Sequence, residues 1–151
     1  MKINFKHVLV VYITAIGVNL LDSVKYPDSK IGLVNVAVSL LAFATIIIFS
    51  NYQIRNSNSN SKRNNVFLVA AIWSGILVYI ITVFKDVMLN NTILDMFSNI
   101  QFPLYILFVT PLFGLNYFLE VTYGKLSMII AIVYSVVLII KVFLEKKYAR
   151  N

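Results

Sequence analysis

Cysteine is absent from this chain of 151 residues, histidine occurs once, and only six residues are acidic. Without cysteine the chain can form neither a disulfide nor a thiolate metal site, and zinc or iron sites need several converging histidine or carboxylate ligands. The sequence also lacks a paired motif such as H-E-x-x-H, a nucleophile–base pair and a glycine-rich phosphate loop. We therefore expect no metal, no cofactor and no catalytic residue.

Charge of either sign is also scarce, at 13% of residues, whereas 60% are hydrophobic. A typical soluble domain has about a quarter charged residues. The excess of apolar residues is concentrated in stretches that contain no charged side chain and no histidine, at 8–21, 31–54, 64–84, 96–119 and 126–140. A helix that spans a membrane needs about 20 mostly apolar residues, so these stretches predict a membrane protein.

The predicted fold is all-α: a polytopic transmembrane helical bundle of five hydrophobic helices, four or five of which cross the membrane fully. We expect one integral membrane domain over residues 1–151, with helices at about 5–21, 31–54, 65–84, 96–119 and 126–144. Residues 55–65 are rich in Asn and Ser and contain no apolar side chain, which is typical of a flexible polar loop.

The fourth stretch contains two of the three prolines, Pro103 and Pro111. Each proline lacks an N–H group, so a carbonyl one turn earlier loses its partner in the helix. In hydrocarbon that carbonyl must be satisfied by a neighbouring helix, a hydroxyl group or a water molecule. We predict that this segment is broken or kinked at its prolines.

The third stretch has a surface of small residues. Ala71 and Gly75, four residues apart, form a small-xxx-small pair that allows another helix to approach closely. Trp73, the only tryptophan, lies between them and needs a partner for its indole N–H at that depth. We expect this partner to be a carbonyl freed by a proline of the fourth segment.

Four other residues are candidates for a polar site inside or beside the apolar stretches. Asn35 and Ser39 share one helix face and can either bind a ligand or join two helices, and helix packing is the commoner use. Asn116 and Glu120 follow Pro111, and Glu120 either turns back toward Asn116 or pairs with Lys125 at the membrane surface.

Two further expectations concern residues near the ends of the last helix. Gly124 is expected to end the preceding helix within the short connection 121–125. Lys141 follows an uncharged run and is expected to extend its amine toward the lipid headgroups.

The membrane topology depends on whether all five segments cross; a first segment that lies along the interface would divide the basic residues nine to four, as would a fourth segment that does not cross. If five helices cross, lysine and arginine divide almost equally between the two sides, six against seven. If the fourth segment instead enters and leaves on one side, with a break near Pro111, nine basic residues lie on one side and four on the other. An excess of basic residues is typical of the cytoplasmic side.

The composition resembles the usage of AT-rich bacterial genomes, because Asn, Lys and Ile are abundant. We expect a small multi-pass protein of a bacterial cell membrane that binds another membrane component besides the lipid bilayer, as an accessory subunit or an immunity-type protein does. The component would be a membrane protein, a membrane-active peptide or a second copy of the chain. The alternatives are a small oligomeric transporter or channel subunit and a lipid-modifying enzyme.

The net charge is +7, but the basic residues are scattered along the chain, so we expect no binding to nucleic acid.

Overall fold

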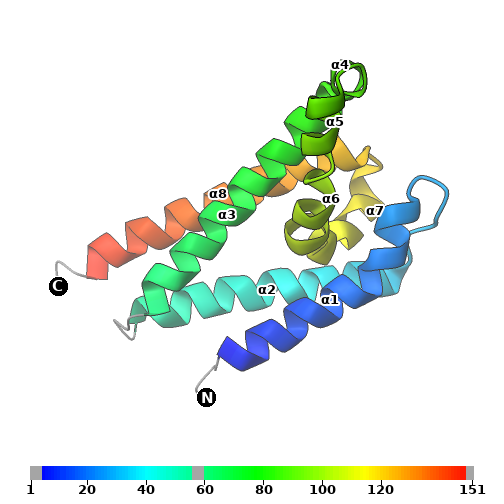
Figure 1. The fold of residues 1–151 in the computed structure, drawn as a ribbon. Coiled ribbons are helices and arrows are strands. Elements are labelled where there is room, and N and C mark those ends of the chain that lie inside the picture. The colour runs from blue at the N-terminus through cyan, green and yellow to red at the C-terminus, as the bar shows by residue number, and fades with distance from the viewer. Residues whose placement is uncertain (1–4, 56–59, 149–151) are drawn as a thin grey trace.

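The protein was analysed as a computed structural model that describes residues 5–55 and 60–148 (Figure 1). Every regular element in these two ranges is helical. The α-helices are α1 (Phe5–Lys25), α2 (Leu33–Arg55), α3 (Asn60–Val83), α4 (Lys85–Leu89), α5 (Thr92–Ser98), α6 (Gln101–Leu104), α7 (Asn116–Leu119) and α8 (Tyr123–Tyr148). Between α6 and α7 lie one π-helical turn, η1 (Tyr105–Val109), and one 3₁₀ segment, η2 (Thr110–Leu115).

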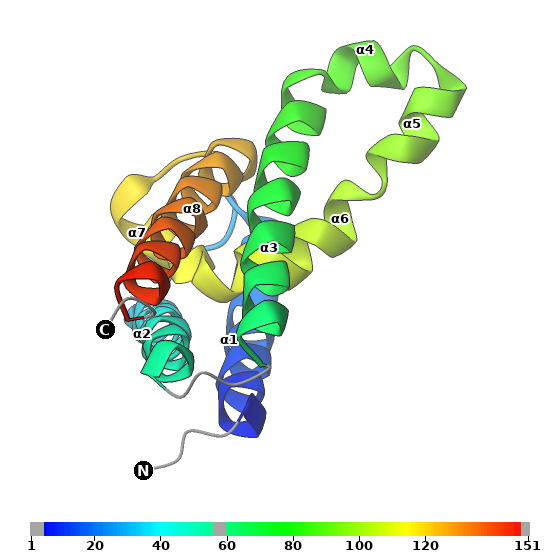
Figure 2. The same cartoon turned by 90° about the vertical axis from the view of Figure 1, so that its left-hand side faces the viewer.

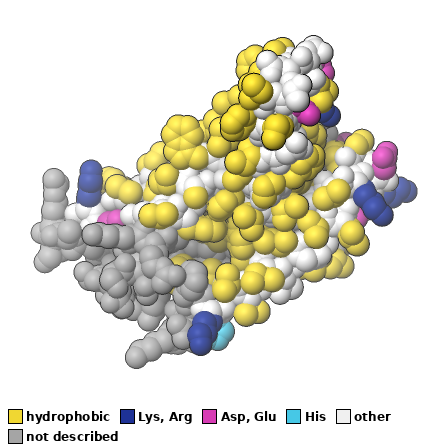
Figure 3. Space-filling model, in the orientation of Figure 1, with side chains coloured by type: hydrophobic (Ala, Val, Ile, Leu, Met, Phe, Trp, Pro, Cys, Tyr) yellow, Lys and Arg dark blue, Asp and Glu magenta, His cyan; other side chains and the backbone are white. Residues whose placement is uncertain are grey.

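Five segments are long and apolar enough to cross a membrane, which identifies the chain as a multi-pass membrane protein. They are Lys6–Lys25, Leu33–Ser50, Asn65–Val83, Thr92–Leu119 and Tyr123–Lys147. Many large apolar side chains point outward from these segments rather than into the bundle. Figure 3 shows these side chains over the middle of one face and the charged ones near its two ends, the distribution that a bilayer requires.

The long helices form two antiparallel pairs. In the first pair, Asn19 near the end of α1 contacts Asn35 near the beginning of α2. In the second pair, the end of α3 lies against the beginning of α8, because a Cβ atom on Gly124 would stand 2.6 Å from the side chain of Thr82. The two pairs diverge toward one end of the bundle, where the fourth segment fills the space between them (Figures 1 and 2).

The fourth segment begins and ends at this same end of the bundle. It follows the end of α3 and leads into the beginning of α8, and these two positions are adjacent. It nevertheless penetrates deeply, since the carbonyl of Leu107 accepts a hydrogen bond from the hydroxyl of Tyr12, thirteen residues before the last residue of α1. The backbone of Tyr12 lies about 20 Å from the end of α1 at 1.5 Å per residue, whereas Thr110 and Pro111 contact Ser23 and Asn19, about 3 and 9 Å from that end. We call the segment re-entrant because it enters and leaves the bundle at one end, while α1, α2, α3 and α8 run along the bundle.

Both prolines of this segment act through the carbonyl groups four residues earlier. The chain bends at residues 99–100, one turn before Pro103, and the carbonyl of Asn99 accepts from the N–H of Phe102 at 3.3 Å. Pro111 has no N–H group to donate to the carbonyl of Leu107. The hydroxyl of Tyr12 donates to this carbonyl in its place. The predicted break at the prolines is confirmed, and its unpaired carbonyl is satisfied by a neighbouring helix.

Some local predictions differ from the structure. Arg55 still belongs to α2, and α3 begins at Asn60, so helix occupies much of the expected loop 55–65; residues 56–59 lie outside the described ranges. Once an apolar helix has formed, adding polar residues costs little. Gly124 does not end a helix. The preceding helix, α7, ends at Leu119, and the next residue, Glu120, has the left-handed φ of 49°, whereas Gly124 lies in the first turn of α8.

Lys141 does not extend toward the headgroups. Its side chain is 1% exposed, and its Nζ lies 2.6 Å from Oδ1 of Asn65 and 3.7 Å from a carboxylate oxygen of Glu145. The antiparallel packing of α3 and α8 places Asn65 opposite this lysine, so that an amide oxygen and a carboxylate offset the cost of burying the charge.

Candidate functional site

A buried polar cluster holds η2, the part of the re-entrant segment that leads back out of the bundle, against α1 and α2. The amide of Asn19 donates to the hydroxyl of Ser39 at 3.0 Å and to the carbonyl of Pro111 at 3.3 Å. The hydroxyl of Ser39 in turn accepts from the backbone N–H of Gly114 at 2.9 Å. Asn35 donates to Asn19 at 3.1 Å and to the carboxylate of Asp22 at 2.9 Å. These groups satisfy one another, so the cluster fixes the position of η2.

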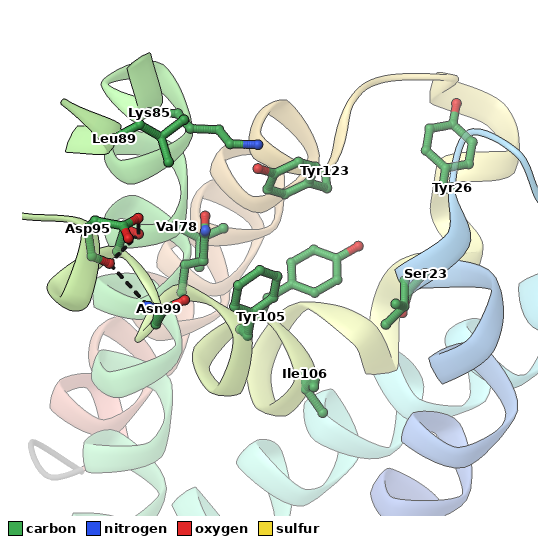
Figure 4. A pocket seen from close by; sticks show the side chains of 14 residues that line it. Ser23, Tyr26, Val78, Lys85, Leu89, Asp95, Asn99, Tyr105, Ile106 and Tyr123 are labelled. Carbon is green, nitrogen blue, oxygen red and sulfur yellow. Dashed lines mark hydrogen bonds between the residues drawn. The ribbon is translucent and has the colours of Figure 1, made fainter. Parts of the chain in front are cut away.

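The part of the segment that leads into the bundle, from α5 to η1, borders a cavity of about 390 Å³ (Figure 4). Its walls come from the ends of α1 and α3, from α4, α5 and α6, from η1 and from the first residue of α8. The bend at residues 99–100 turns α5 away from the axis of the segment and so opens this space. A volume of this size is typical of sites for small ligands, and the walls combine apolar side chains with a few polar groups.

Two buried polar atoms at this cavity have no hydrogen-bond partner: Oε1 of Gln101 and the hydroxyl of Tyr105. Each of these residues is only 6% exposed, and their spacing of four places them on one face of the chain. The hydroxyl of Ser23 lies close enough to that of Tyr105 to interact with it, and it also donates to the carbonyl of Leu20 and contacts Thr110. An unsatisfied buried polar atom costs about 1–3 kcal/mol. Because both atoms are shielded from the cavity as well as from solvent, Gln101 and Tyr105 border the cavity through their other atoms.

The same cavity is lined by one positive and one negative side chain, Lys85 of α4 and Asp95 of α5. Within the described ranges they form no ion pair with each other or with another residue. Figure 4 shows the amine of Lys85 extending toward Tyr123, while Asp95 lies on the opposite wall beside Asn99. Asn99 donates to the backbone carbonyl of Asp95 at 3.2 Å, and the side chain of Ser98 lies 3.5 Å from its carboxylate.

The structure places the four polar candidates away from this cavity. Asn35 and Ser39 belong to the buried cluster described above. Asn116 is fully buried and bonds through its amide to both backbone groups of Val121, at 2.9 and 3.1 Å, so it closes the turn before α8. Glu120 is exposed at that turn and forms no ion pair with a described residue.

The small residues of α3 face α8. Ala71 is 1% exposed, and a Cβ atom on Gly75 would stand 2.5 Å from the carbonyl oxygen of Ser127. Trp73, in contrast, is 61% exposed on the outer surface. The expectation that its indole would pair with a proline-freed carbonyl is wrong, because the carbonyl of Leu107 accepts from Tyr12.

Sequence reasoning missed the cavity residues as a group. Gln101 and Tyr105 are not among the sequence candidates, because amides and tyrosines occur in several of the apolar stretches. Their spacing of four around Pro103 could have indicated a shared polar face within an apolar segment. Lys85 and Asp95 lie between two uncharged stretches, and nothing in the sequence shows how the residues there fold back over the segment.

The described residues contain no group of three or more histidine or carboxylate side chains that could hold a metal ion. Asp22, Asp86 and Glu120 lie at the same end of the bundle but are not gathered into one site. No protein-family model, curated protein or solved structure matches this chain.

Proposed function

We propose that this chain is a small, non-enzymatic protein of a bacterial cell membrane that acts by binding another membrane component, and that the component occupies the cavity between α4, α5 and η1. An accessory subunit or an immunity-type protein works in this way. The observation that carries the proposal is the cavity itself, whose wall combines apolar side chains with Lys85 and Asp95, two charged residues that form no ion pair within the described ranges. The buried polar cluster around Asn19 is used to hold the re-entrant segment in place.

The transporter or channel hypothesis has one supporting observation, the broken re-entrant segment itself. It also requires the polar faces at Asn35 with Ser39, or at Gln101 with Asn116, to meet around a water-accessible space. Three of these four residues use their side chains in internal hydrogen bonds, and only Gln101 lines the cavity. A lipid-modifying enzyme would need acidic side chains that converge on one point, and the acids at this end of the bundle are separated.

The experiment compares what co-purifies with the wild-type protein and with two tryptophan variants. Ile106→Trp fills the cavity, whereas the neighbouring Leu107→Trp adds the same bulk to a side chain that faces outward. Each protein is extracted in a mild detergent, checked by size-exclusion chromatography and analysed by mass spectrometry for bound lipids and peptides. The proposal predicts a component in stoichiometric amount with wild type and Leu107→Trp and its loss with Ile106→Trp. Equal amounts of every component with the three proteins would contradict it.

A further inference from the structure

The cavity lies at the level where lipid headgroups meet the apolar core. Lys85 and Asp95 lie between the uncharged stretches of the sequence, while Phe102 and Ile106 lie within the apolar segment. Tyr26 and Tyr123 also line the cavity, and tyrosine is enriched at both membrane surfaces. A ligand in this position would hold its polar part beside the charged residues and its apolar part beside the phenylalanine and isoleucine.

We propose that the bound membrane component is a zwitterionic phospholipid with a primary ammonium group, of the phosphatidylethanolamine type; this inference rests on the proposed function. The first argument is the pair of opposite charges in one cavity that do not pair with each other. A headgroup with a phosphate and an ammonium offers an opposite charge to each of Lys85 and Asp95. A headgroup with a net negative charge would leave the carboxylate of Asp95 unpaired.

The second argument is the kind of hydrogen bond that the walls require. The carboxylate of Asp95 only accepts hydrogen bonds, so the ligand must supply N–H or O–H donors to it. A primary ammonium has three N–H groups, whereas the quaternary ammonium of phosphatidylcholine has none. The site should therefore distinguish these two lipids, which carry the same charges.

The third argument is the way the cavity opens to the lipid-facing surface. Its volume of about 390 Å³ accommodates a headgroup and glycerol but not two complete acyl chains. Leu89 and Phe102 line the cavity and are also among the exposed large apolar residues. They lead from the polar interior to the outer surface, so the acyl chains can extend from the cavity into the surrounding bilayer.

The test measures binding of soluble, short-chain lipids to the full-length protein in detergent by isothermal titration calorimetry. The probes are dihexanoyl-phosphatidylethanolamine, the matching phosphatidylcholine and phosphatidylglycerol, and free phosphoethanolamine. We expect the phosphatidylethanolamine to bind at least tenfold more tightly than the other three. Equal binding of the ethanolamine and choline lipids would overturn the inference. Equal binding of free phosphoethanolamine would assign the site to a soluble zwitterion and would overturn it too.

Two pairs of variants separate a binding effect from a general loss of charge. Lys85→Gln and Asp95→Asn should each weaken binding of the ethanolamine lipid by about tenfold or more, since hydrogen bonds to charged groups are among the stronger ones. Lys125→Gln and Asp86→Asn remove the same charges at the same end of the bundle but outside the cavity wall, and should leave binding unchanged. Asp95→Asn should also reduce the preference for ethanolamine over choline. Equal effects of cavity and control variants would overturn the inference.

The co-purification experiment distinguishes failure of this inference from failure of the proposed function. If the wild-type protein carries a peptide or another lipid that Ile106→Trp loses, the chain still binds a membrane component, and only the lipid assignment is wrong. If nothing is lost with Ile106→Trp, the proposed function fails as well.

Discussion

Replacing Gly114 by alanine should strongly destabilise the protein, because the re-entrant segment touches α2 at this residue through its backbone. A Cβ atom on Gly114 would stand 2.0 Å from the carbonyl oxygen of Asn35 and 2.7 Å from the hydroxyl of Ser39. Neither the backbone of α2 nor a buried hydroxyl with two hydrogen-bond contacts can move aside without breaking the polar cluster. Overpacking costs about 1–3 kcal/mol, and loss of the bond from the Gly114 N–H to Ser39 adds about 1–3 kcal/mol.

The free energy of unfolding of the Gly114→Ala variant should therefore fall by about 2–6 kcal/mol, measured by titration with sodium dodecyl sulfate in mixed micelles and followed by circular dichroism. Gly17→Ala is the matched control, because no atom lies within 4 Å of the position of its Cβ. At that exposed helical position alanine should stabilise the protein by up to about 1 kcal/mol. If both variants unfold like the wild type, the re-entrant segment does not pack against α2 as described.

Three other predictions concern the same segment. Tyr12→Phe removes the donor to a proline-freed carbonyl and should lower the free energy of unfolding by about 1–3 kcal/mol, whereas the exposed control Tyr117→Phe should have no measurable effect. Gln101→Met removes an unpartnered buried oxygen, so in detergent it should raise the unfolding free energy by about 1 kcal/mol or more; a loss of stability would contradict the description of this oxygen. Single cysteines at Asp28 and Lys125 should react with an impermeant maleimide from the same side of intact cells, and reaction from opposite sides would show five crossings.

The fold class follows from the sequence because lipid imposes simple requirements on it. Long uncharged stretches must be helical, since a helix alone satisfies the backbone hydrogen bonds within one segment. The break in the fourth segment also follows, because proline removes a backbone donor whatever the surroundings. The helix ends are less predictable: Glu120 rather than Gly124 adopts the left-handed conformation, and the glycine is used for contact with Thr82. A local preference for glycine at helix ends does not reveal a requirement that comes from another helix.

The candidate site depends on contacts that local patterns do not contain. Asn35 and Ser39 are correctly placed on one helix face, but only the structure shows that their partners are Asn19 and the backbone of η2. The cavity arises because α4 and α5 fold back over η1, and this placement brings Lys85 to the same space as Tyr105. Residues that the sequence assigns to a connecting loop and to an apolar segment thus become one site.

The fold of the fourth segment agrees with one of the two divisions of the basic residues. The beginning of α1, the end of α2, the beginning of α3 and the end of α8 all lie at the end of the bundle opposite the cavity (Figure 1). In the sequence nine of the thirteen lysine and arginine residues flank these points, and only Lys25, Lys30, Lys85 and Lys125 flank the cavity end. An excess of basic residues favours the cytoplasmic side, so the cavity is expected to open toward the outer leaflet. A protein with this orientation would meet its ligand, whether a lipid or a membrane-active peptide, from outside the cell.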